Sequence, residues 1–379
     1  MTVDEQENDF VNDGDEGAVR SEMRACLVSG NSDGHTNNWA ILVSASRYWF
    51  NYRHLANALG MYRAIRRLGI PDSNIILMLP DDISCNARNR YPGSVYAHKD
   101  HRMDLYGERV EVDYRGYEVT VENFLRVLTG RHEEHTPSSK RLLSDENSNV
   151  LLYLTGHGGD EFLKFQDTEE LNSQDIADAV EQMRLKKRYN KMLFISDTCQ
   201  AATLANSLYS QDVLAIGSSV KGQNSYSHHT DKQIGVGVIE GFTHFTLNAL
   251  SDIDSHSQLT LADFIDSFDR SKIKSTPGVR SDLFGSLDDS LLTDFFAGNI
   301  DVDVLSPETE HCMQHAEQER QDVDVDVDVD VDAESSSHTP ASAHNIPNEP
   351  STPNTQNQNA VYLLICIISL SISVGLGLR

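Results

Sequence analysis

The sequence predicts an α/β fold in which a mostly parallel central sheet is covered by helices on both faces. Five apolar runs of strand length occur at residues 39–45, 75–79, 150–155, 192–196 and 213–217. Between the first four runs, apolar residues recur every three or four positions, which is the spacing of a helix that buries one face. Strands that alternate with helices in this way form three-layer sandwiches around a parallel sheet.

The first strand and the first helix have the clearest signals. Residues 39–45 (WAILVSA) form a continuous apolar run, typical of a central parallel strand covered on both sides. The helix that follows is marked by apolar residues three or four positions apart: Leu55, Leu59, Tyr62, Ile65 and Leu68. Gly69 and Pro71 then end this helix.

The later elements complete a single domain, which is predicted over residues 36–298. Helical patterns at 120–128 and 172–185 supply cover for the sheet. Residues 110–119 alternate between polar and apolar and predict an inserted hairpin, and two more helices are expected at 235–250 and 261–268. The fold is expected to end near Phe296.

Both flanks of this domain are acidic and are predicted to be disordered, over residues 1–35 and 299–359. Residues 1–20 carry seven acidic residues against one arginine, and residues 301–334 carry thirteen against one. The Asp-Val alternation at 322–332 would place six carboxylates on one face of a strand, and their repulsion favours an open chain. A solvated linker is the preferred interpretation, with an interaction motif or a calcium-binding tract as alternatives.

The C-terminal residues 360–378 are almost wholly apolar and predict a membrane-spanning helix. At 1.5 Å per residue such a helix just crosses a hydrocarbon core of about 30 Å. A buried core helix is disfavoured because the preceding polar residues offer nothing to pack against, and a cleaved lipid-anchor attachment signal is the other alternative. Residues 1–20 contain no apolar stretch, so no N-terminal secretory signal is predicted.

Composition excludes several classes of site. The middle of the chain has no basic stripe with interleaved aromatic residues, so nucleic acid is not expected as a partner. The five cysteines (Cys26, Cys85, Cys199, Cys312 and Cys366) form no CxxC pair, which argues against structural zinc and against a disulfide framework. The glycine-rich turn at 156–159 has histidine at its centre and lacks the Gly-Lys-Ser/Thr ending of a phosphate loop.

Polar residues follow three of the predicted strands at the point where each strand ends. Residues 156–159 (GHGG) follow strand 150–155, and residues 197–200 (DTCQ) follow strand 192–196. The loop after the first strand leads to residues 51–54 (NYRH). The carboxyl ends of parallel strands meet at one edge of the sheet, so we expect these three loops to share a crevice.

His157 and Cys199 are the residues best suited to chemistry in that crevice. Glycines on both sides of His157 let a substrate approach closely, and the Gly158 amide is free to point at an oxyanion. A thiol that gives its proton to an imidazole becomes the thiolate that attacks carbonyl groups. Taken singly, Cys199 suits a core position, His157 a loop and Asp197 a turn cap, but the cysteine and histidine together favour catalysis.

Several segments resemble the legumain-type clan of cysteine peptidases, whose core is similar to that of caspases. They are residues 51–54 (NYRH), 153–159 (YLTGHGG) and 194–200 (FISDTCQ). Residues 117–130 (YEVTVENFLRVLTG), 139–143 (SKRLL) and 162–167 (FLKFQD) are similar to its GPI transamidase branch in particular. The resemblance covers about residues 38–298 and implies a caspase/legumain-like three-layer sandwich.

The resemblance implies a role for each residue of the site. Cys199 would be the nucleophile, His157 the general base and Asn51 the residue that orients the imidazole. The amides of Gly158 and Cys199 would hold the oxyanion. An amide oxygen can keep one ring nitrogen protonated without adding charge, which suits Asn51, although an N-cap of the following helix is the alternative.

The resemblance also implies that three further residues bind substrate and that one cysteine joins the chain to a partner subunit. Arg53, Ser218 and Ser219 occupy positions similar to the pocket that receives the residue before the scissile bond. Cys85 lies in a polar loop and resembles a cysteine that links the enzyme to a partner subunit by a disulfide, as an oxidising lumen permits.

No cofactor is expected for the chemistry itself, but the resemblance implies a structural calcium ion. Its ligands would be Asp72, Glu111, Asp113 and the backbone carbonyl of Ile75, which are oxygen donors of the type that calcium prefers. Glu111 and Asp113 are two residues apart and so lie on the same side of a strand. A solvated acidic edge is the alternative.

The implied function is a two-step acyl transfer at the endoplasmic reticulum membrane, within a complex of several subunits. The catalytic domain would be luminal and held by a single membrane helix. A proprotein would lose its C-terminal signal to form a thioester, which the ethanolamine amine of a preformed GPI lipid resolves. An asparaginyl endopeptidase, with water in place of the amine, and a non-catalytic scaffold subunit of the same fold are the alternatives.

Overall fold

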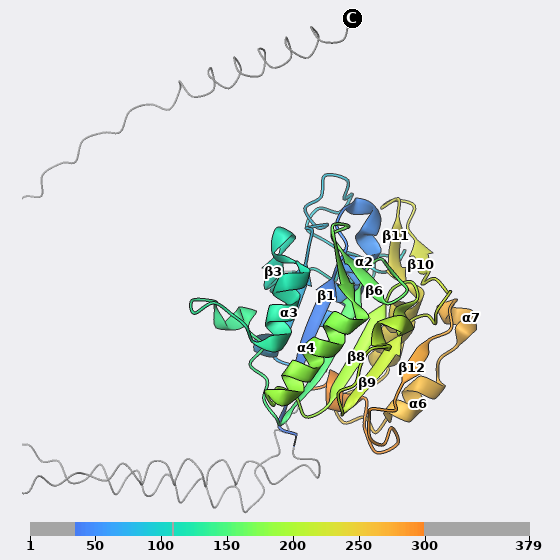
Figure 1. Ribbon diagram of the computed structural model, residues 1–379. Helices are drawn as coiled ribbons and strands as arrows, with labels where there is room; N and C mark the ends of the chain where they lie inside the picture. The colour runs from blue at the N-terminus through green and yellow to red at the C-terminus, as the bar shows by residue number, and fades with distance from the viewer. Residues whose placement is uncertain (1–34, 108–109, 299–379) are drawn as a thin grey trace, which may run out of the picture. The chain divides into compact units, whose positions relative to one another are not determined.

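A computed structural model describes residues 35–107 and 110–298 of the chain (Figure 1). The predictions for residues 1–34 and 299–379, including the acidic linker and the membrane helix at 360–378, lie outside the described residues. Within the described part of the chain, no helix has both the length and the apolarity that crossing a membrane requires.

The centre of the fold is a seven-stranded sheet with the strand order β12-β9-β8-β4-β1-β2-β3. Its strands are β1 (Asn37–Ser44), β2 (Ile75–Leu79), β3 (Tyr114–Arg115), β4 (Ser148–Thr155), β8 (Met192–Asp197), β9 (Val213–Gly217) and β12 (Gly278–Arg280). Every neighbouring pair is parallel except β12 and β9, which are antiparallel. The predicted mostly parallel sheet, with all five predicted strands, is therefore confirmed.

The sheet separates two hydrophobic cores. Along β1, Ala40 and Leu42 pack into one core while Ile41 and Val43 pack into the other, because successive side chains point to opposite faces. All four side chains are fully buried. This double burial explains why the central strands are continuous apolar runs and do not alternate with polar residues.

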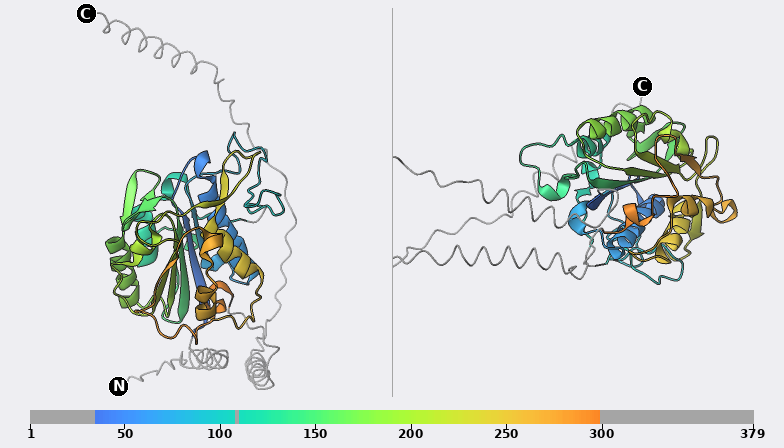
Figure 2. Two further views of the ribbon diagram at one scale, coloured as in Figure 1. Left: turned by 90° about the vertical axis from the view of Figure 1, so that its right-hand side faces the viewer. Right: turned by 90° about the horizontal axis from the view of Figure 1, so that it is seen from below.

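Helices cover both faces of the sheet and complete the three layers (Figure 2). The first core includes residues of α2 (Tyr52–Arg67), α5 (Gly241–Ser251), α6 (Leu261–Asp266), α7 (Arg270–Ile273) and α8 (Thr293–Phe296). The second includes residues of α3 (Val121–Thr129) and α4 (Ser173–Leu185). Short 3-10 helices occur at η1 (Trp49–Asn51), η2 (Asp72–Asn74), η3 (Gly116–Glu118), η4 (Ser138–Lys140) and η5 (Ala201–Ala205).

Two predicted elements were wrong. Residues 110–119 do not form a hairpin, because the Asp113 amide donates to the Leu77 carbonyl (3.0 Å) and the Asp113 carboxylate accepts from the Leu77 amide (2.9 Å). These bonds bind the segment to β2, and β3 pairs with β2 in parallel. Val112, Asp113 and Tyr114 are all buried, with Val112 in the first core and Tyr114 in the second, so the polar and apolar alternation of the sequence does not correspond to one buried face and one exposed face.

The predicted helix at 235–250 begins only at Gly241. The preceding residues form β11 (Gly237–Glu240), which pairs in antiparallel fashion with β10 (Ser227–Thr230). Gly235 has a φ of 84°, a conformation that favours glycine, and its amide donates to the Asp231 carbonyl (2.8 Å). This turn reverses the chain and so prevents the helix from starting earlier.

A second small sheet was missed by the sequence analysis. It contains β5 (Gly158–Gly159), β6 (Phe162–Phe165) and β7 (Glu169–Asn172), paired in antiparallel order. Strands of two to four residues give too short a pattern to be read from the sequence. The sheet begins directly after His157, so the pairing of β5 with β6 fixes the direction of the backbone at the glycine-rich turn.

Candidate active site

The three loops predicted to share a crevice do begin side by side. Ser44 at the end of β1 pairs with Thr155 at the end of β4, and Thr155 pairs with Asp197 at the end of β8. The residues that follow these three positions therefore emerge at one edge of the sheet, as the order of the strands predicted, and the crevice between them stays a prediction.

Asn51 and His157 are in direct contact across two of these loops. The Oδ1 atom of Asn51 lies 2.7 Å from Nε2 of His157, while its Nδ2 donates to the Arg47 carbonyl (2.6 Å). The Arg47 carbonyl can only accept, so the amide oxygen must face the histidine and Nε2 must carry the proton. Nδ1 of His157 is then left as the acceptor.

Asn51 is the N-cap residue of α2, but its side chain makes no capping hydrogen bond. The side chain is fully buried and is used entirely by Arg47 and His157. The alternative interpretation of Asn51 as an ordinary helix cap is therefore not supported, and its contacts are those of a residue that orients an imidazole.

His157 is held in its neutral form. Burial lowers its pKa below the usual value, and the charge of Arg53 lowers it further. The ring of His54 packs edge-on against it, with ring centres 4.9 Å apart, and burial keeps the pKa of His54 well below its usual range as well. A neutral imidazole with a free Nδ1 can act as a general base at neutral pH.

Cys199 is a free, half-buried thiol in the loop after β8. The next residue, Gln200, has a left-handed φ of 55°. Its amide donates to the Gln223 carbonyl (2.9 Å), and its side chain accepts from the Gly222 amide (2.9 Å). Within residues 35–107 and 110–298 no hydrogen bond joins Cys199 to His157, as is common when no substrate is bound.

Gly158 lies against the nucleophile loop, and no larger residue fits there. A Cβ atom at this position would lie 2.6 Å from the Phe162 carbonyl oxygen and 2.7 Å from Oγ1 of Thr198. Gly158 is opposite Leu163, and the flanking hydrogen bond runs from the Lys164 amide to the His157 carbonyl (2.8 Å). The Gly158 amide therefore points away from β6 and is free to bind an oxyanion.

Arg53 is anchored by a buried glutamate that the sequence analysis missed. Its Nε donates to Oε1 of Glu240 (2.6 Å), and Nε2 of His54 lies 3.2 Å from the same oxygen. Burial raises the pKa of Glu240, which is only 3% exposed. The sequence did contain a sign of this contact: Glu240 directly follows the apolar run 236–239, so it is expected to be buried. A buried carboxylate needs a partner of opposite charge.

Ser218 and Ser219 contact the loop that carries Cys199, but they are buried beneath it and do not face solvent. Both are fully buried, and their hydroxyl groups donate to the Thr198 carbonyl (3.2 and 2.9 Å). Asp197 is also buried and accepts from the hydroxyls of Ser225 (2.7 Å) and Thr243 (2.6 Å). The hydroxyl groups of Ser218 and Ser219 thus support the loop that carries Cys199, while Asp197 is bonded to side chains from two other segments.

The predicted calcium ligands also lie together. The carboxyl groups of Asp72 and Glu111 share a hydrogen bond, which raises the pKa of Glu111. Burial raises the pKa of Asp113 to about 7, and the charges of Glu111 and Asp72 add to this effect. Ile75 directly follows η2, which contains Asp72. The raised pKa values of Glu111 and Asp113 show that these two carboxyl groups feel neighbouring negative charge, and oxygen donors of this kind suit a hard cation.

Cys85 is an exposed free thiol. The Asp82 carboxylate accepts from the amides of Ser84 (3.1 Å) and Cys85 (3.2 Å), which gives its loop a fixed turn. The thiol is therefore accessible from solvent, on a loop whose shape is set by local hydrogen bonds.

A polar cavity of about 340 Å³ adjoins the nucleophile loop. It is lined by Gly222, Gln223, Asn224, Tyr226, Arg270, Lys274, Ser275 and Thr276. Gly222 and Gln223 are the residues that hold Gln200 in place. The cavity is thus connected through hydrogen bonds to the residue that follows Cys199.

The chain is similar to known proteins over the part that contains this site. The family model described as the Peptidase C13 family matches residues 38–277. A GPI-anchor transamidase of Saccharomyces cerevisiae is 62% identical over 264 residues, which are 69% of this chain and 64% of that protein. The matched part is thus slightly less than two thirds of the yeast protein.

Other relatives bear the same name. A GPI-anchor transamidase of Schizosaccharomyces pombe is 58% identical, covering 72% of each chain. The Homo sapiens protein of that name is 52% identical, covering 75% of this chain and 72% of its own. Among solved structures, caspase-1 from Spodoptera frugiperda matches 69% of this chain and 94% of its own, at 13% identity and a TM-score of 0.37.

Proposed function

Because the chain belongs to the Peptidase C13 family, we propose that it is a cysteine-dependent transamidase, the catalytic subunit that attaches GPI anchors to proproteins. Relatives that are 52 to 62% identical are named GPI-anchor transamidases. The observation that carries the proposal is the contact between Asn51 and His157 beside the Cys199 loop, since it leaves Nδ1 of His157 as the base.

In the first step, Nδ1 of His157 takes the proton of the Cys199 thiol. The thiolate attacks the amide carbonyl at the attachment site of the proprotein, and the amides of Gly158 and Cys199 stabilise the oxyanion. His157 then gives the proton to the leaving nitrogen. The C–N bond breaks, the C-terminal signal departs with a free amine, and the remaining protein is held as a thioester.

In the second step, the amine of the GPI ethanolamine attacks the thioester carbonyl. His157 accepts a proton from this nitrogen, and the amides of Gly158 and Cys199 again stabilise the oxyanion of the tetrahedral intermediate. The C–S bond then breaks. The proton returns to the Cys199 sulfur. The product is a new amide between the protein and the lipid, and no water is consumed.

The remaining predicted residues have supporting parts in this proposal. Arg53 is held by Glu240 beside His157, which suits a pocket for the residue before the scissile bond. Ser218 and Ser219 support that pocket through the Thr198 carbonyl. Cys85, which is exposed, suits a disulfide to a partner subunit in the oxidising lumen.

A structural calcium ion is also part of the proposal. Asp72, Glu111, Asp113 and the Ile75 carbonyl would hold it, and it would replace the mutual repulsion of three carboxylates by attraction to one cation. The ion would supply no chemistry to the acyl transfer. Asp113 is bonded to β2, so the ion would fasten the segment before β3 to the sheet.

We further propose that the enzyme works at the endoplasmic reticulum membrane with its catalytic domain in the lumen. Residues 360–378 have the length and apolarity of a single anchoring helix. Both substrates are membrane-bound, so an anchored enzyme meets them at a raised effective concentration.

The test uses microsomes from cells that lack their own catalytic subunit. They are supplied with this protein or its Cys199→Ala variant, a proprotein carrying a GPI signal, and hydrazine as a small amine. We expect a proprotein hydrazide with the wild type and none with Cys199→Ala. Cleavage that yields only the free acid would identify a peptidase, and absence of cleavage by an assembled wild-type complex would refute the enzymatic proposal.

A further inference from the structure

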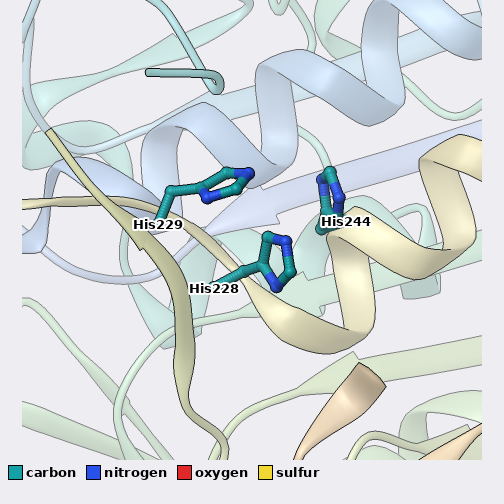
Figure 3. Close-up of side chains that lie close together, drawn as sticks. All are labelled: His228, His229 and His244. Carbon is teal, nitrogen blue, oxygen red and sulfur yellow. The ribbon is translucent and has the colours of Figure 1, made fainter. Parts of the chain in front are cut away.

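Three histidines outside the catalytic site converge in the space between β10 and α5 (Figure 3). His228 and His229 belong to β10, and His244 belongs to α5. One ring nitrogen from each of them lies within 4.8 Å of the others. The rings of His228 and His244 are stacked with centres 4.1 Å apart, and His229 meets His228 edge-on at 4.1 Å.

Two nitrogens of this cluster are buried without a hydrogen-bond partner among the described residues. They are Nδ1 of His228 and Nε2 of His229. Burying an imidazole nitrogen without a partner costs free energy, so such atoms usually indicate an absent ligand. In His244, Nε2 lies 3.2 Å from Nδ2 of Asn248, one turn further along α5. With this orientation of the Asn248 amide, Nε2 is the acceptor and Nδ1 carries the proton of the neutral ring. Nδ1 of His244 becomes a metal ligand when the Asn248 amide turns over, so that its oxygen accepts a hydrogen bond from Nε2.

The geometry points to a transition-metal site, of the Zn²⁺ class, formed by His228, His229 and His244. Three imidazoles are a ligand set that suits zinc, copper or nickel, and not calcium or magnesium. Zinc binds imidazole nitrogens at about 2.0–2.1 Å, which places neighbouring ligand atoms about 3.4 Å apart. The present separations are at most 4.8 Å, and metal binding would require the stacked rings of His228 and His244 to rotate so that one nitrogen of each points to the same ion.

A fourth histidine and two lysines lie close to the cluster. The ring of His98 packs against that of His229, with ring centres 5.0 Å apart. Lys99 and Lys274 are near enough to His229 to act on it electrostatically, and their positive charges oppose the binding of a cation. Only neutral imidazole is a metal ligand, so a bound metal would have to compete with protons for these rings.

The metal would join two elements that form one wall of the active site. Ser227 of β10 pairs with Glu240, which holds Arg53, and His244 follows Thr243, which donates to Asp197. A metal bound to both β10 and α5 would therefore fix the hairpin that carries Glu240 relative to the helix behind Cys199. This role is structural, and it stands independently of the proposed transamidation.

The test measures metal binding to the full-length Cys199→Ala chain, which lacks the catalytic thiol. After treatment with a chelator, the chain is titrated with Co²⁺, whose visible absorption reports imidazole coordination, and then with Zn²⁺ as competitor. We expect one tight equivalent per chain, visible bands lost on adding Zn²⁺, and a Tm about 5 °C higher with Zn²⁺ than without it.

Two ligand variants and one control decide the outcome. His229→Asn and His244→Gln, on separate elements, should each weaken Zn²⁺ binding at least about 100-fold, more than the loss of an outer partner does. His256→Asn removes an exposed histidine and should change nothing. If both ligand variants fold without metal and bind Zn²⁺ as tightly as the control does, the site does not exist.

Discussion

A single side chain, Asn51, determines which nitrogen of His157 can act as a base. Its amide is oriented by the Arg47 carbonyl, so its oxygen faces Nε2 of the histidine. The interaction fixes the tautomer without adding a charge that would raise the pKa of the imidazole. Asn51 is a positioning residue, since it acts on the reaction through His157.

Replacing Asn51 with alanine should lower kcat about 10- to 100-fold, because a fraction of His157 would then carry its proton on Nδ1. KM should change little because Asn51 is not placed at the substrate, whereas Tm should fall by a few degrees because two buried hydrogen bonds, to Arg47 and His157, are lost. Single-turnover release of the signal measures the effect. Asn51→Asp is the matched control: it keeps the acceptor, so it should retain more activity, and a KM effect alone would contradict the assignment.

Arg53 sets the acid limit of activity. Its charge is the main influence on the pKa of His157 after burial, and it acts more strongly than the opposing charges of Asp167 and Glu240. Arg53→Gln should therefore raise the pKa of His157 and move the acid limb of the kcat profile to higher pH. Arg53→Lys, which keeps the charge, should leave the limb in place, and a limb unmoved by Arg53→Gln would refute the coupling.

At the scale of single residues, the sequence predicted those that follow apolar strands. Cys199, His157 and Gly158 were found because a run of buried residues locates the end of each strand. Glu240 was not, because its partner Arg53 is 187 positions away and no local pattern connects them. The histidine cluster was missed for the same reason, since β10 and α5 meet only after the chain turns at Gly235.

At the scale of elements, long central strands were predictable and short edge strands were not. β1 and β4 are eight residues long, and double burial gives each of them a continuous run of five apolar residues, at 39–43 and 150–154. β5 has two residues and β12 has three, and each is held in place by pairing with a neighbour. Pairing with a distant partner leaves no trace in a window of a few residues.

The small sheet β5-β6-β7 requires glycine at position 158. Gly158→Ala would place a methyl group against the Phe162 carbonyl and Thr198, at distances that real Cβ atoms essentially never show. We expect a loss of kcat of about 100-fold or more, the size typical of a lost oxyanion donor. The exposed Gly285→Ala, where a Cβ meets nothing within 4 Å, is the control. Full activity in Gly158→Ala would exclude its amide from the oxyanion site.

The acidic cluster beside β2 predicts a response to calcium. Calcium should raise Tm by several degrees and EGTA should reverse this, because the ion relieves repulsion among carboxylates whose pKa values are raised. Differential scanning fluorimetry measures the shift. Asp113→Asn should abolish the response, while the exposed Asp252→Asn should preserve it. If calcium raises Tm equally in the wild type, Asp113→Asn and Asp252→Asn, the ion does not bind at Asp113.

For the whole molecule, two effects of acid oppose each other. The net charge of −27 falls as carboxylates are protonated, which reduces repulsion. Burial raises the pKa of Asp197 to about 6, so the folded state takes up a proton before the unfolded state does, and Asp197 stabilises the fold as pH falls through 6. Histidines with lowered pKa values have the opposite effect, because they make the folded state less stable as pH falls.

Buried neutral histidines should dominate below pH 6.5. His54 is fully buried, and His132 and His157 are partly buried, and all have lowered pKa values. The unfolded chain protonates these residues near pH 6.5 while the folded chain does not, which costs up to about 1.4 kcal/mol per residue for each pH unit. Among the described residues, six histidines have lowered pKa values (His54, His132, His157, His228, His229 and His244) and four carboxylates have raised ones (Glu111, Asp113, Asp197 and Glu240). Because the histidines outnumber the opposing carboxylates, the free energy of unfolding should be greatest near pH 6.5 and fall toward pH 5.

Urea denaturation of the full chain between pH 5 and 8, in the presence of a chelator, measures this maximum. Asp197→Asn removes one of the opposing carboxylates, so the stability of this variant should fall more steeply below pH 6.5 than that of the wild type. His54→Gln should fall less steeply, because one buried neutral imidazole is gone. If stability instead rises continuously from pH 7 to 5, the protonation of carboxylates outweighs that of the histidines. If His54→Gln also has the same slope as the wild type, His54 is not held neutral in the folded protein.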